Sequence, residues 1–422
     1  MDSPLFLQRE AKLFVAFDDT SVFEIPLLEG FSFSQGTNVT EVALSEASSD
    51  GVTSRRGTAR FTDSLAPAEF SFSTYVRPFK STGNATPTTN AFRSGNSYHT
   101  SVETCLWALF AGAKSYTATS STVNAAFVSA SAGEAVTTFD GTDADITFEH
   151  SNKLQLHTPD FYLSLGVDKG TATGATVEAL YKLSGAVLNE ATINFDIDGI
   201  ATIDWAGFAT LIEDVSANPE SKGFISGTTS EVTPTVAEGI SATNNFIQNR
   251  LSTVTLTNAT DPNSNYLDEY TLTLTGGSIN FSNNIEYVTP STMGVVNQPL
   301  GHYTGARAVS GTLHCYLDGG TGRSKDLFED LAESSTFDAV TFFGLTINLG
   351  GTTASTPRLA ISVPAAHLEI PVHAVDEVIG MEVNFHGLPS SGSAAALVQT
   401  ISAANEASLK YIGITPDNNA GD

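Results

Sequence analysis

Short runs in which apolar residues alternate with Ser, Thr, Asp or Asn dominate this chain. Clusters of Gly, Asn and Asp separate the runs, which is the pattern of half-buried antiparallel strands joined by turns. The alternation predicts a mainly β fold and argues against a parallel α/β sheet. The clearest predicted strands are residues 13–17, 22–28, 31–34, 70–76, 161–167, 180–188 and 193–205.

Helical spacing of apolar residues is confined to a few stretches. In residues 101–113 one face is apolar, with Thr100 as the predicted N-cap and Glu103 completing a capping box. Cys105 lies on that face and is predicted to be a small core residue rather than a reactive thiol. Residues 324–333 form a second predicted helix, and residues 394–405 are a weaker candidate for a third.

The order of these elements occurs twice, which predicts a duplication. The segment 30–34 in the first half has a counterpart at 277–282, each after two predicted strands. Residues 180–208 align without gaps on 360–388 at an offset of 180, so that Trp205 falls on Phe385. Identity between the halves is low, and the competing explanation is that any two β-rich, Thr-rich sequences can be aligned.

The duplication sets the predicted domain organisation. Residues 216–242 are rich in Ser, Thr, Gly, Glu and Pro and are predicted to be a linker, and the acidic segment 131–149 is expected to be a surface excursion. The units are predicted to be residues 1–215, with an inserted loop at 77–99, and residues 243–390, followed by a C-terminal extension at 391–422.

Composition and charge narrow the classes of function. The chain has 422 residues, with 19 Lys and Arg against 46 Asp and Glu, and a net charge of −27. So few cations cannot neutralise a run of phosphates, which disfavours tight binding of nucleic acid. The 26 Phe residues suffice to build cores, so disorder is not expected.

Two cysteines, Cys105 and Cys315, exclude a disulfide framework. The N-terminus has no basic segment followed by an apolar one, and no run approaches 18 apolar residues. The sequence therefore predicts a protein made in the cytosol that does not enter a membrane.

Candidate chemical motifs are incomplete. Residues 261–265 supply the first oxygens of a calcium loop, but Tyr266 replaces the required Gly. An acidic loop at 140–145, the pair His367 and His373, and the Gly-rich turn 319–325 are better explained as structural. The sequence therefore predicts no enzyme, no metal site and no cofactor.

Arginines are rare, so their placement is informative. Arg55 and Arg56 lie in the irregular stretch 45–57, and Arg307 directly follows the corresponding stretch, 289–305. They are candidates for contacts with acidic groups of a neighbouring subunit, and solvated loop charges are the equally weighted alternative.

The order of elements resembles the tail tube (major tail) proteins of tailed bacteriophages. The resemblance rests on a pattern of segments over most of residues 6–388, with no single diagnostic motif. Its segments are the strand pair ending at 30–34, the excursion 45–57, the returning strand 70–76, the helix after it, the closing strands ending at 203–207, and the second-half equivalents through 383–387.

The resemblance implies two tandem β-sandwich or barrel-like units, each a pair of antiparallel sheets with a flanking helix. Inner sheets of six units would join into a ring, and rings would stack into a tube through which DNA passes without tight binding. A chain with two units implies three chains per ring with pseudo-sixfold symmetry. The implied partners are other copies of the chain and other tail proteins, such as sheath, baseplate or tail-tip and terminator proteins. The implied location is the virion tail, with the host cytoplasm during assembly.

An acidic wall would repel phosphates as DNA passes. Strand-borne acids are the lumen candidates, since alternation places them opposite the core, and we name Glu41, Asp204 and Glu286. That each of them faces the outer solvent or an interface is the equally weighted alternative. Arg55, Arg56 and Arg307 are the candidates for contacts between rings.

A two-domain β-sandwich binding module, such as a viral fibre or a lectin-like surface protein, is the alternative from another class. It would place aromatic residues on loops to stack on sugars. The two tryptophans, Trp107 and Trp205, fall instead in a predicted helix and a predicted strand.

Overall fold

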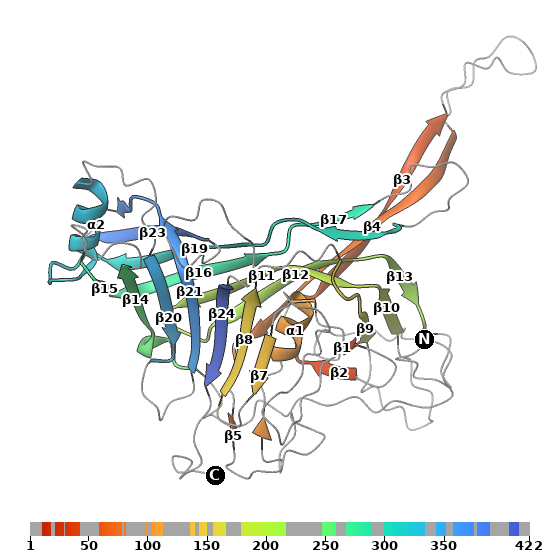
Figure 1. Ribbon diagram of the computed structural model, residues 1–422. Coiled ribbons are helices and arrows are strands. Elements are labelled where there is room, and N and C mark those ends of the chain that lie inside the picture. The colour runs from red at the N-terminus through yellow and green to blue at the C-terminus, as the bar shows by residue number, and fades with distance from the viewer. Residues whose placement is uncertain are drawn as a thin grey trace, which may run out of the picture.

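A computed structural model provides the structure of the chain (Figure 1). The residues it describes are 11–17, 22–28, 30–42, 59–77, 80–81, 98–99, 103–112, 136–139, 143–149, 155–165, 179–216, 247–258, 267–288, 299–333, 343–351, 358–374, 378–388 and 405–412.

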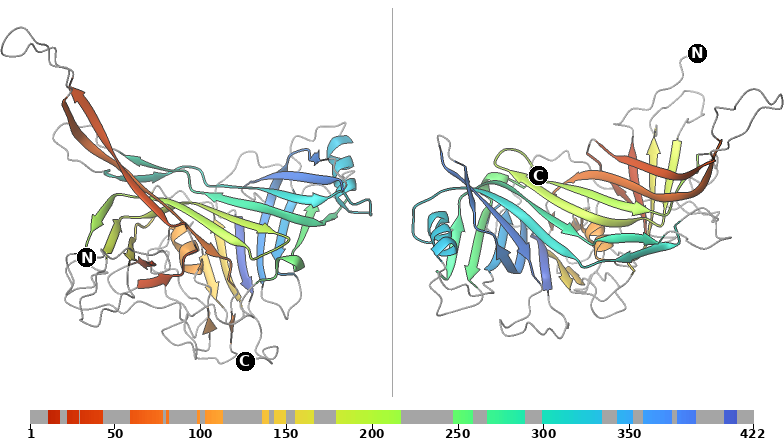
Figure 2. Two further views of the ribbon diagram at one scale, coloured as in Figure 1. Left: turned by 180° about the vertical axis from the view of Figure 1, so that it is seen from behind. Right: turned by 90° about the horizontal axis from the view of Figure 1, so that it is seen from above.

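One long antiparallel sheet, the central sheet, runs through the whole molecule (Figures 1 and 2). Strands from both halves of the sequence contribute to it, and they meet where β11 pairs with β16. Its strands, in spatial order, are β3 (Ser32–Val42), β4 (Ala59–Tyr75), β12 (Thr202–Ala209), β11 (Val187–Asp196), β16 (Leu274–Ser282), β19 (Ala308–Tyr316), β23 (Gly380–Gly387) and β22 (Val372–Ala374).

A second layer covers the apolar face of the central sheet. One part is a five-stranded sheet in the order β13 (Leu211–Asp214), β10 (Ala179–Ser184), β9 (Asp160–Leu165), β1 (Lys12–Ala16) and β2 (Val22–Ile25). The other part has the order β15 (Glu269–Leu272), β14 (Thr253–Asn258), β20 (Phe343–Leu349), β21 (Arg358–Leu368), β24 (Asn405–Ile412), β8 (Asp143–Glu149) and β7 (Val136–Phe139).

The remaining elements are two helices and two hairpins. Helix α1 (Glu103–Phe110) lies between the two parts of the second layer, and α2 (Ser324–Glu333) lies at one end of the molecule, beside β15 (Figure 1). The hairpins pair β17 (Ile285–Val288) with β18 (Gly301–Thr304) and β5 (Lys80–Ser81) with β6 (Tyr98–His99), and a 3-10 turn, η2, covers Asn249–Leu251.

The pairing order of the strands is the same in the two halves. The central sheet has β3-β4-β12-β11 from the first half and β16-β19-β23-β22 from the second. The second layer has β2-β1-β9-β10 from the first half and β15-β14-β20-β21 from the second. This repeat supports the inferred duplication. The boundaries of the units remain a prediction, since most of the proposed linker lies outside the described residues.

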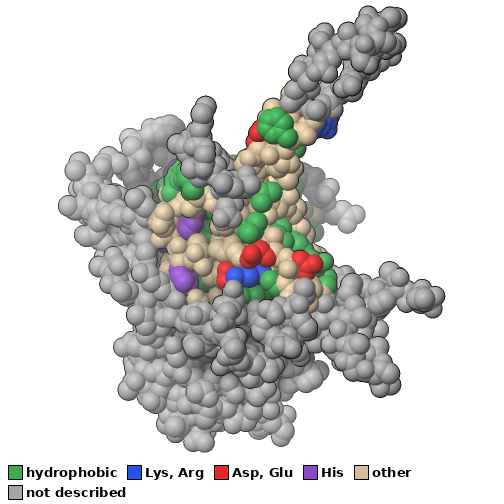
Figure 3. All heavy atoms as spheres, turned by 90° about the vertical axis from the view of Figure 1, so that its right-hand side faces the viewer, with side chains coloured by type: hydrophobic (Ala, Val, Ile, Leu, Met, Phe, Trp, Pro, Cys, Tyr) green, Lys and Arg blue, Asp and Glu red, His purple; other side chains and the backbone are tan. Residues whose placement is uncertain are grey.

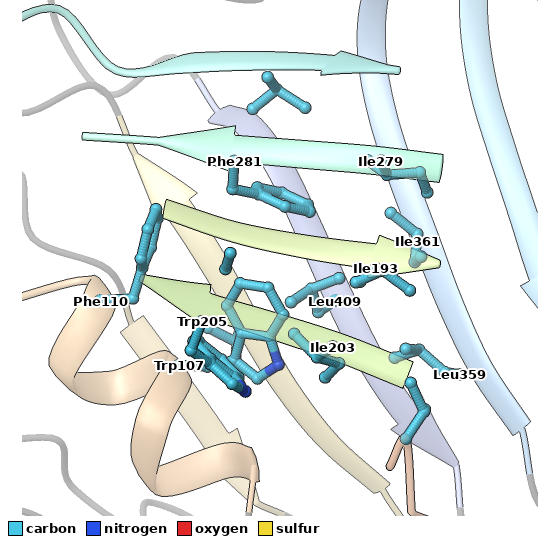
Figure 4. Packing of buried hydrophobic residues seen from close by; sticks show 14 of the residues in the cluster. Trp107, Phe110, Ile193, Ile203, Trp205, Ile279, Phe281, Leu359, Ile361 and Leu409 are labelled. Carbon is cyan, nitrogen blue, oxygen red and sulfur yellow. The ribbon is translucent and has the colours of Figure 1, made fainter. Parts of the chain in front are cut away.

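Strict alternation in the central strands builds the core. Ile203, Ile193 and Ile279 lie opposite one another on β12, β11 and β16, and all three are fully buried. Leu359 and Ile361 of β21 and Leu409 of β24 face them from the second layer (Figure 4). Residues of both halves therefore share one apolar core, whose burial is the main stabilising term.

Helix α1 is embedded in this core. All eight of its residues are buried, because sheets surround it on several sides. The Trp107 ring lies 4.7 Å from the ring of Trp205 and 5.2 Å from that of Phe281, between centroids (Figure 4). Phe281 belongs to the second half, so the helix of the first half packs against a strand of the second.

The predicted mainly β fold is confirmed, and the predicted helices match α1 and α2. Four sequence predictions need correction. Residues 180–188 belong to two strands, β10 and β11, because the chain turns at Gly185, whose φ is +62°. Residues 193–205 form two strands rather than one, because the chain turns at Gly199, whose φ of +111° suits glycine. Residues 289–305 are not irregular throughout, since β18 pairs with β17. Residues 143–149 are no surface excursion, because β24 pairs with β8 and buries Ile146 and Phe148.

The helix predicted over 394–405 falls almost wholly outside the described residues, where only β24 begins, at Asn405. The N-cap Thr100 and most of the inserted loop 77–99 also fall outside them. α1 begins at Glu103, two residues later than predicted, and the Glu103 carboxylate lies 3.6 Å from Nε of Arg77.

The β17–β18 hairpin of the second half is held against the first half. Tyr287 donates a hydrogen bond to the carbonyl of Gly185 at 3.2 Å. The backbone N–H of Leu156 donates to Nε2 of His302 at 3.0 Å, so His302 must be neutral at that nitrogen. His302 is 5% exposed, and burial lowers its pKa below the ordinary value of 6.5.

Replacing Phe281 by Ala should lower the free energy of unfolding by about 3–5 kcal/mol, since it opens a cavity beside Trp107. Chemical denaturation of the purified chain measures this change. Phe61→Ala is the matched control, because Phe61 is 52% exposed and its loss should change stability little. An equal effect of the two substitutions would contradict the proposed role of Phe281 in the shared core.

The hairpin contact should weaken in acid. The folded chain binds a proton at His302 less readily than the unfolded chain, so the contribution of His302 is complete above about pH 6.5. It is lost as the pH falls through the lowered pKa of the folded state. The free energy of unfolding should therefore drop more for the wild type than for His302→Gln between pH 7.5 and pH 5. A constant difference between the two proteins over this range would refute the role of His302.

Candidate functional site

The face of the central sheet opposite the core is a continuous polar surface, which we call the polar face. Residues that share it lie opposite one another from strand to strand, as the register requires. Its members are Ser71, Ser73, Glu190, Thr192, Asn194, Asp204, Ser278, Asn280, Ser310, Thr312, His314, Glu382, Asn384 and His386.

Hydrogen bonds connect side chains of neighbouring strands across this face. Asp204 accepts one from the Ser73 hydroxyl at 2.5 Å and one from the Asn194 amide at 2.7 Å. Asn280 donates to the Thr192 hydroxyl at 2.8 Å, and Thr312 donates to the Asn384 amide oxygen at 2.8 Å. Cross-strand pairs of this kind stabilise the sheet and fix the direction of each side chain.

Formal positive charge is scarce on the polar face. The five central strands β12, β11, β16, β19 and β23 contain no Lys or Arg. Two histidines lie beside acids, with His314 Nδ1 3.8 Å from Glu382 and His386 Nε2 3.5 Å from Glu369. Within these five strands, the polar face therefore presents acids, amides, hydroxyls and histidines but no Lys or Arg.

The central sheet ends in two strands that each pair on one side within the described part of the chain. β3 pairs with β4, and β22 pairs with β23. Ile370 and Val372 at the β22 edge are 62% and 64% exposed. An exposed apolar edge strand is a template for pairing with another chain.

The outer halves of β3 and β4 project from the body as an extended hairpin, which we call the arm (Figures 1 and 2). Arg60 forms an ion pair with Glu41 at 2.5 Å, and both side chains are exposed. Val39 and Phe61 are 47% and 52% exposed. Figure 3 shows hydrophobic, acidic and basic side chains together near the outer end of the described arm.

The residues singled out from the sequence lie in different places. Asp204 is on the polar face, Glu41 is on the arm, and Glu286 is on β17, where it accepts a hydrogen bond from Tyr303. Arg307 makes contacts within the chain: its Nε donates to Asn283 at 3.1 Å, and its guanidinium lies 5.6 Å from the Phe148 ring centroid. Arg55 and Arg56 fall outside the described residues.

Asn283, which sequence reasoning missed, lies at the junction of the two halves. It is 2% exposed and donates to the carbonyls of Phe110 and Leu188 at 2.8 and 3.1 Å. Together with Arg307 it connects α1, β11 and the chain around β16. One Asn of the pair Asn283-Asn284 in a short polar turn carries no sequence signal of such a role.

The other sequence candidates show no assembled site. The described residues contain no group of three or more His, Cys, Asp and Glu placed to hold a metal ion. Ser324 holds the Gly-rich turn before α2, since it accepts from Asp318 N–H at 2.7 Å and donates to the Tyr316 carbonyl. Residues 261–265 lie outside the described part of the chain. No helix within the described ranges is long and apolar enough to span a membrane.

Cys105 and Cys315 are free thiols in the core, as predicted for Cys105. Burial raises the pKa of the Cys105 thiol well above its ordinary value and that of Cys315 to about 12, so neither is activated. Trp107 and Trp205 are 0% and 1% exposed. Neither tryptophan is available to stack on a sugar, which counts against the lectin-like alternative.

Comparison with known proteins agrees with the absence of an assembled catalytic or metal site among the described residues. No protein-family model matches the chain. Over 392 residues the chain is 27% identical to the tail tube protein pb6 of Escherichia phage T5, a similarity that covers 92% of this chain and 73% of pb6. The resemblance predicted from the order of the strands is therefore confirmed: this chain is a homologue of a phage tail tube protein, with a structural role in the tail tube of the virion.

Proposed function

We propose that three copies of this chain close a ring with pseudo-sixfold symmetry, that the rings stack into a tube, and that the polar face lines its lumen. The observation that carries the proposal is the pairing of β11 with β16. It joins the last strand of one four-stranded set to the first strand of the next, and the two sets have the same order.

The same joint can be repeated between chains. Within the chain, Thr192 lies opposite Asn280. The offset of 180 relates Thr192 to Val372, and the alignment of 277–282 with 30–34 relates Asn280 to Ser32. Val372 of β22 in one chain would then lie opposite Ser32 of β3 in the next.

Ring closure explains the exposed edges. β3 and β22 are the two ends of the central sheet, and pairing them between copies leaves no edge open. Such a head-to-tail contact closes into a ring when the rotation fits. With two sets per chain and six in the ring, three chains complete it.

The polar face then supplies the wall of the channel. The five central strands β12, β11, β16, β19 and β23 carry acids, amides and hydroxyls but no Lys or Arg, so phosphates would meet no fixed partner there. Asp204 is our first lumen candidate. Glu41 and Glu286 lie toward the arm and the β17–β18 hairpin, and would contribute only near the boundary between rings.

The arm would reach the adjacent ring. Residues 43–58 connect its two strands in the sequence, and Arg55 and Arg56 in this segment remain candidates for that contact. For Arg307 the contacts with Asn283 and Phe148 favour a role in holding the chain together. We further propose that the chain has no enzymatic activity, meets sheath, baseplate or tail-tip and terminator proteins, and assembles in the host cytoplasm.

The register predicts a specific crosslink. A chain carrying both Ser32→Cys and Val372→Cys should form disulfides between chains, because opposite residues in antiparallel strands are about 4.5–5.5 Å apart between Cα atoms. Oxidation of assembled tubes followed by denaturing electrophoresis should give one, two and three linked chains and nothing larger. The buried native cysteines do not interfere.

Two variants control this experiment. Thr192→Cys with Asn280→Cys should give a disulfide within one chain and no ladder, since these residues are opposite each other in the structure. Ser32→Cys with Leu267→Cys should give neither. A ladder that extends to six chains, or tubes that do not crosslink at all, would contradict the trimeric ring and its register.

The lumen assignment predicts how added charge changes the behaviour toward DNA. Wild-type tubes should not retain duplex DNA at physiological salt. Asn280→Lys with Thr312→Lys should create salt-dependent retention, measured by cosedimentation over a salt series. Leu267→Lys with Ala332→Lys adds the same charge at exposed positions outside the central sheet and should retain much less. Equal retention by both variants would refute the assignment.

A further inference from the structure

The exposed large hydrophobic residues are not scattered over the described surface. Two of them, Ile370 and Val372, belong to the β22 edge, and Leu267 stands apart. The others fall into two groups at opposite ends of the central sheet: Ile197, Leu251, Tyr316, Val378 and Ile379 at one end, and Val39, Phe61, Val288, Leu300 and Tyr303 at the other.

The first group, which we call the end row, is held together by backbone hydrogen bonds between the strand ends. Ile197 N–H donates to the Thr275 carbonyl at 3.1 Å, and Tyr316 N–H donates to the Thr273 carbonyl at 3.0 Å. Leu317 N–H donates to the Ile379 carbonyl at 3.0 Å.

Leu251 lies at the same end of the sheet. Its neighbours Arg250 and Ser252 line a pocket of about 200 Å³ together with Ile197 and Leu274. The end row therefore borders a shallow hollow rather than a flat edge.

The second group lies on the arm and on the β17–β18 hairpin. In the register of β4 with β12, Ala68 is opposite Ala209 and Tyr75 is opposite Thr202. The arm extends beyond Ala68, whereas the end row lies beyond Tyr75. The β17–β18 hairpin connects the end of β16 to the start of β19, which is the arm's end of the sheet.

We propose that the end row is the surface on which the arm and the β17–β18 hairpin of a second copy, in the adjacent ring, dock. The inference rests on the proposed stacking of rings. The two surfaces differ from each other and face opposite ways, so copies can join head to tail and the contact repeats without limit along one axis. Exposed apolar patches of this kind mark sites of association.

Charges accompany the apolar residues on both surfaces. The arm carries the exposed pair Glu41 and Arg60. Asp198 and Arg250, next in sequence to Ile197 and Leu251 of the end row, form another exposed pair, with 2.6 Å between Arg250 Nη2 and Asp198 Oδ1. A contact between the two would have an apolar centre and a rim of both signs, which is the usual composition of a protein interface. Two arms meeting each other would leave both end rows exposed.

The end row can be tested by placing carboxylates in it. Ile197→Asp with Tyr316→Asp should still give rings by electron microscopy, but the mean tube length should fall at least about tenfold, because each contact would bury unpaired charge. Leu267→Asp, at an exposed position outside the central sheet, should leave tube length unchanged. Equal midpoints of chemical denaturation would show that the double variant is folded.

The outcomes separate this inference from the proposed function. Absence of rings and tubes in the wild type would overturn the proposed function itself. Tubes of normal length from the double variant would overturn the end row alone. Loss of rings as well as tubes in the folded double variant would also overturn it, because the end row would then belong to the contact within a ring.

A mixing experiment identifies the occupant. Chains with Phe61→Cys and chains with Tyr316→Cys, combined and assembled, should react with a short thiol crosslinker to give mixed dimers. Leu267→Cys in place of Tyr316→Cys should give none. Dimers that join two Phe61→Cys chains, without mixed dimers of Phe61→Cys and Tyr316→Cys chains, would show that arms meet arms. This result would refute the docking of the arm on the end row.

Discussion

The backbone pairing of β11 with β16 is the contact on which the rest of the architecture depends. It runs without a bulge from Glu190 to Asp196 and merges two four-stranded sets into one sheet. Because side chains alternate, this register keeps Ile193 and Ile279 on the core side and Thr192 and Asn280 on the polar face. A slip of β16 by one residue along β11 would turn the apolar side chains of the second set toward water. The polarity of the two faces therefore depends on the register of this pairing.

The core behind this joint makes it hard to separate the halves. Phe281 of β16 packs against Trp107 of α1, and Asn283 donates to carbonyls of α1 and of β11. Opening the joint would expose aromatic rings and leave buried polar groups of Asn283 without partners, and both changes are costly. The corresponding position in the first half is Gln35, which bonds instead to residues 66, 210 and 212 of its own half. The β11–β16 pairing within the chain is therefore stabilised by buried hydrogen bonds of Asn283 that have no counterpart at the β3 edge.

Sequence periodicity predicted well which side chains of a strand face the core, but it predicted poorly which strands are adjacent in the sheets. Alternation identified Asp204 as opposite the core, and it identified α1 and α2 from their apolar spacing. A period of two indicates on which face of the sheet a residue lies, but it does not indicate which strand is adjacent. The alternation therefore could not predict that β24 pairs with β8. Residues 143–149 seemed to be solvent-exposed because acids surround Ile146 and Phe148, yet these two side chains suffice to anchor a buried strand. The edge at β22 was missed as well, since Pro371 interrupts the pattern and only three residues follow as strand.

β4 has 17 residues and no break, so one extended segment runs from the arm through the polar face to the core. At about 3.3 Å per residue it spans roughly 55 Å. Its register with β3 shifts near Gln35 and Asn38, where the arm leaves the body, while its pairing with β12 shows no shift. We therefore expect the segment to bend more easily where the arm leaves the body than where it crosses the central sheet. A load applied to the arm would twist the molecule at those two irregularities and reach the central sheet as tension along β4, which the backbone hydrogen bonds with β12 resist in shear.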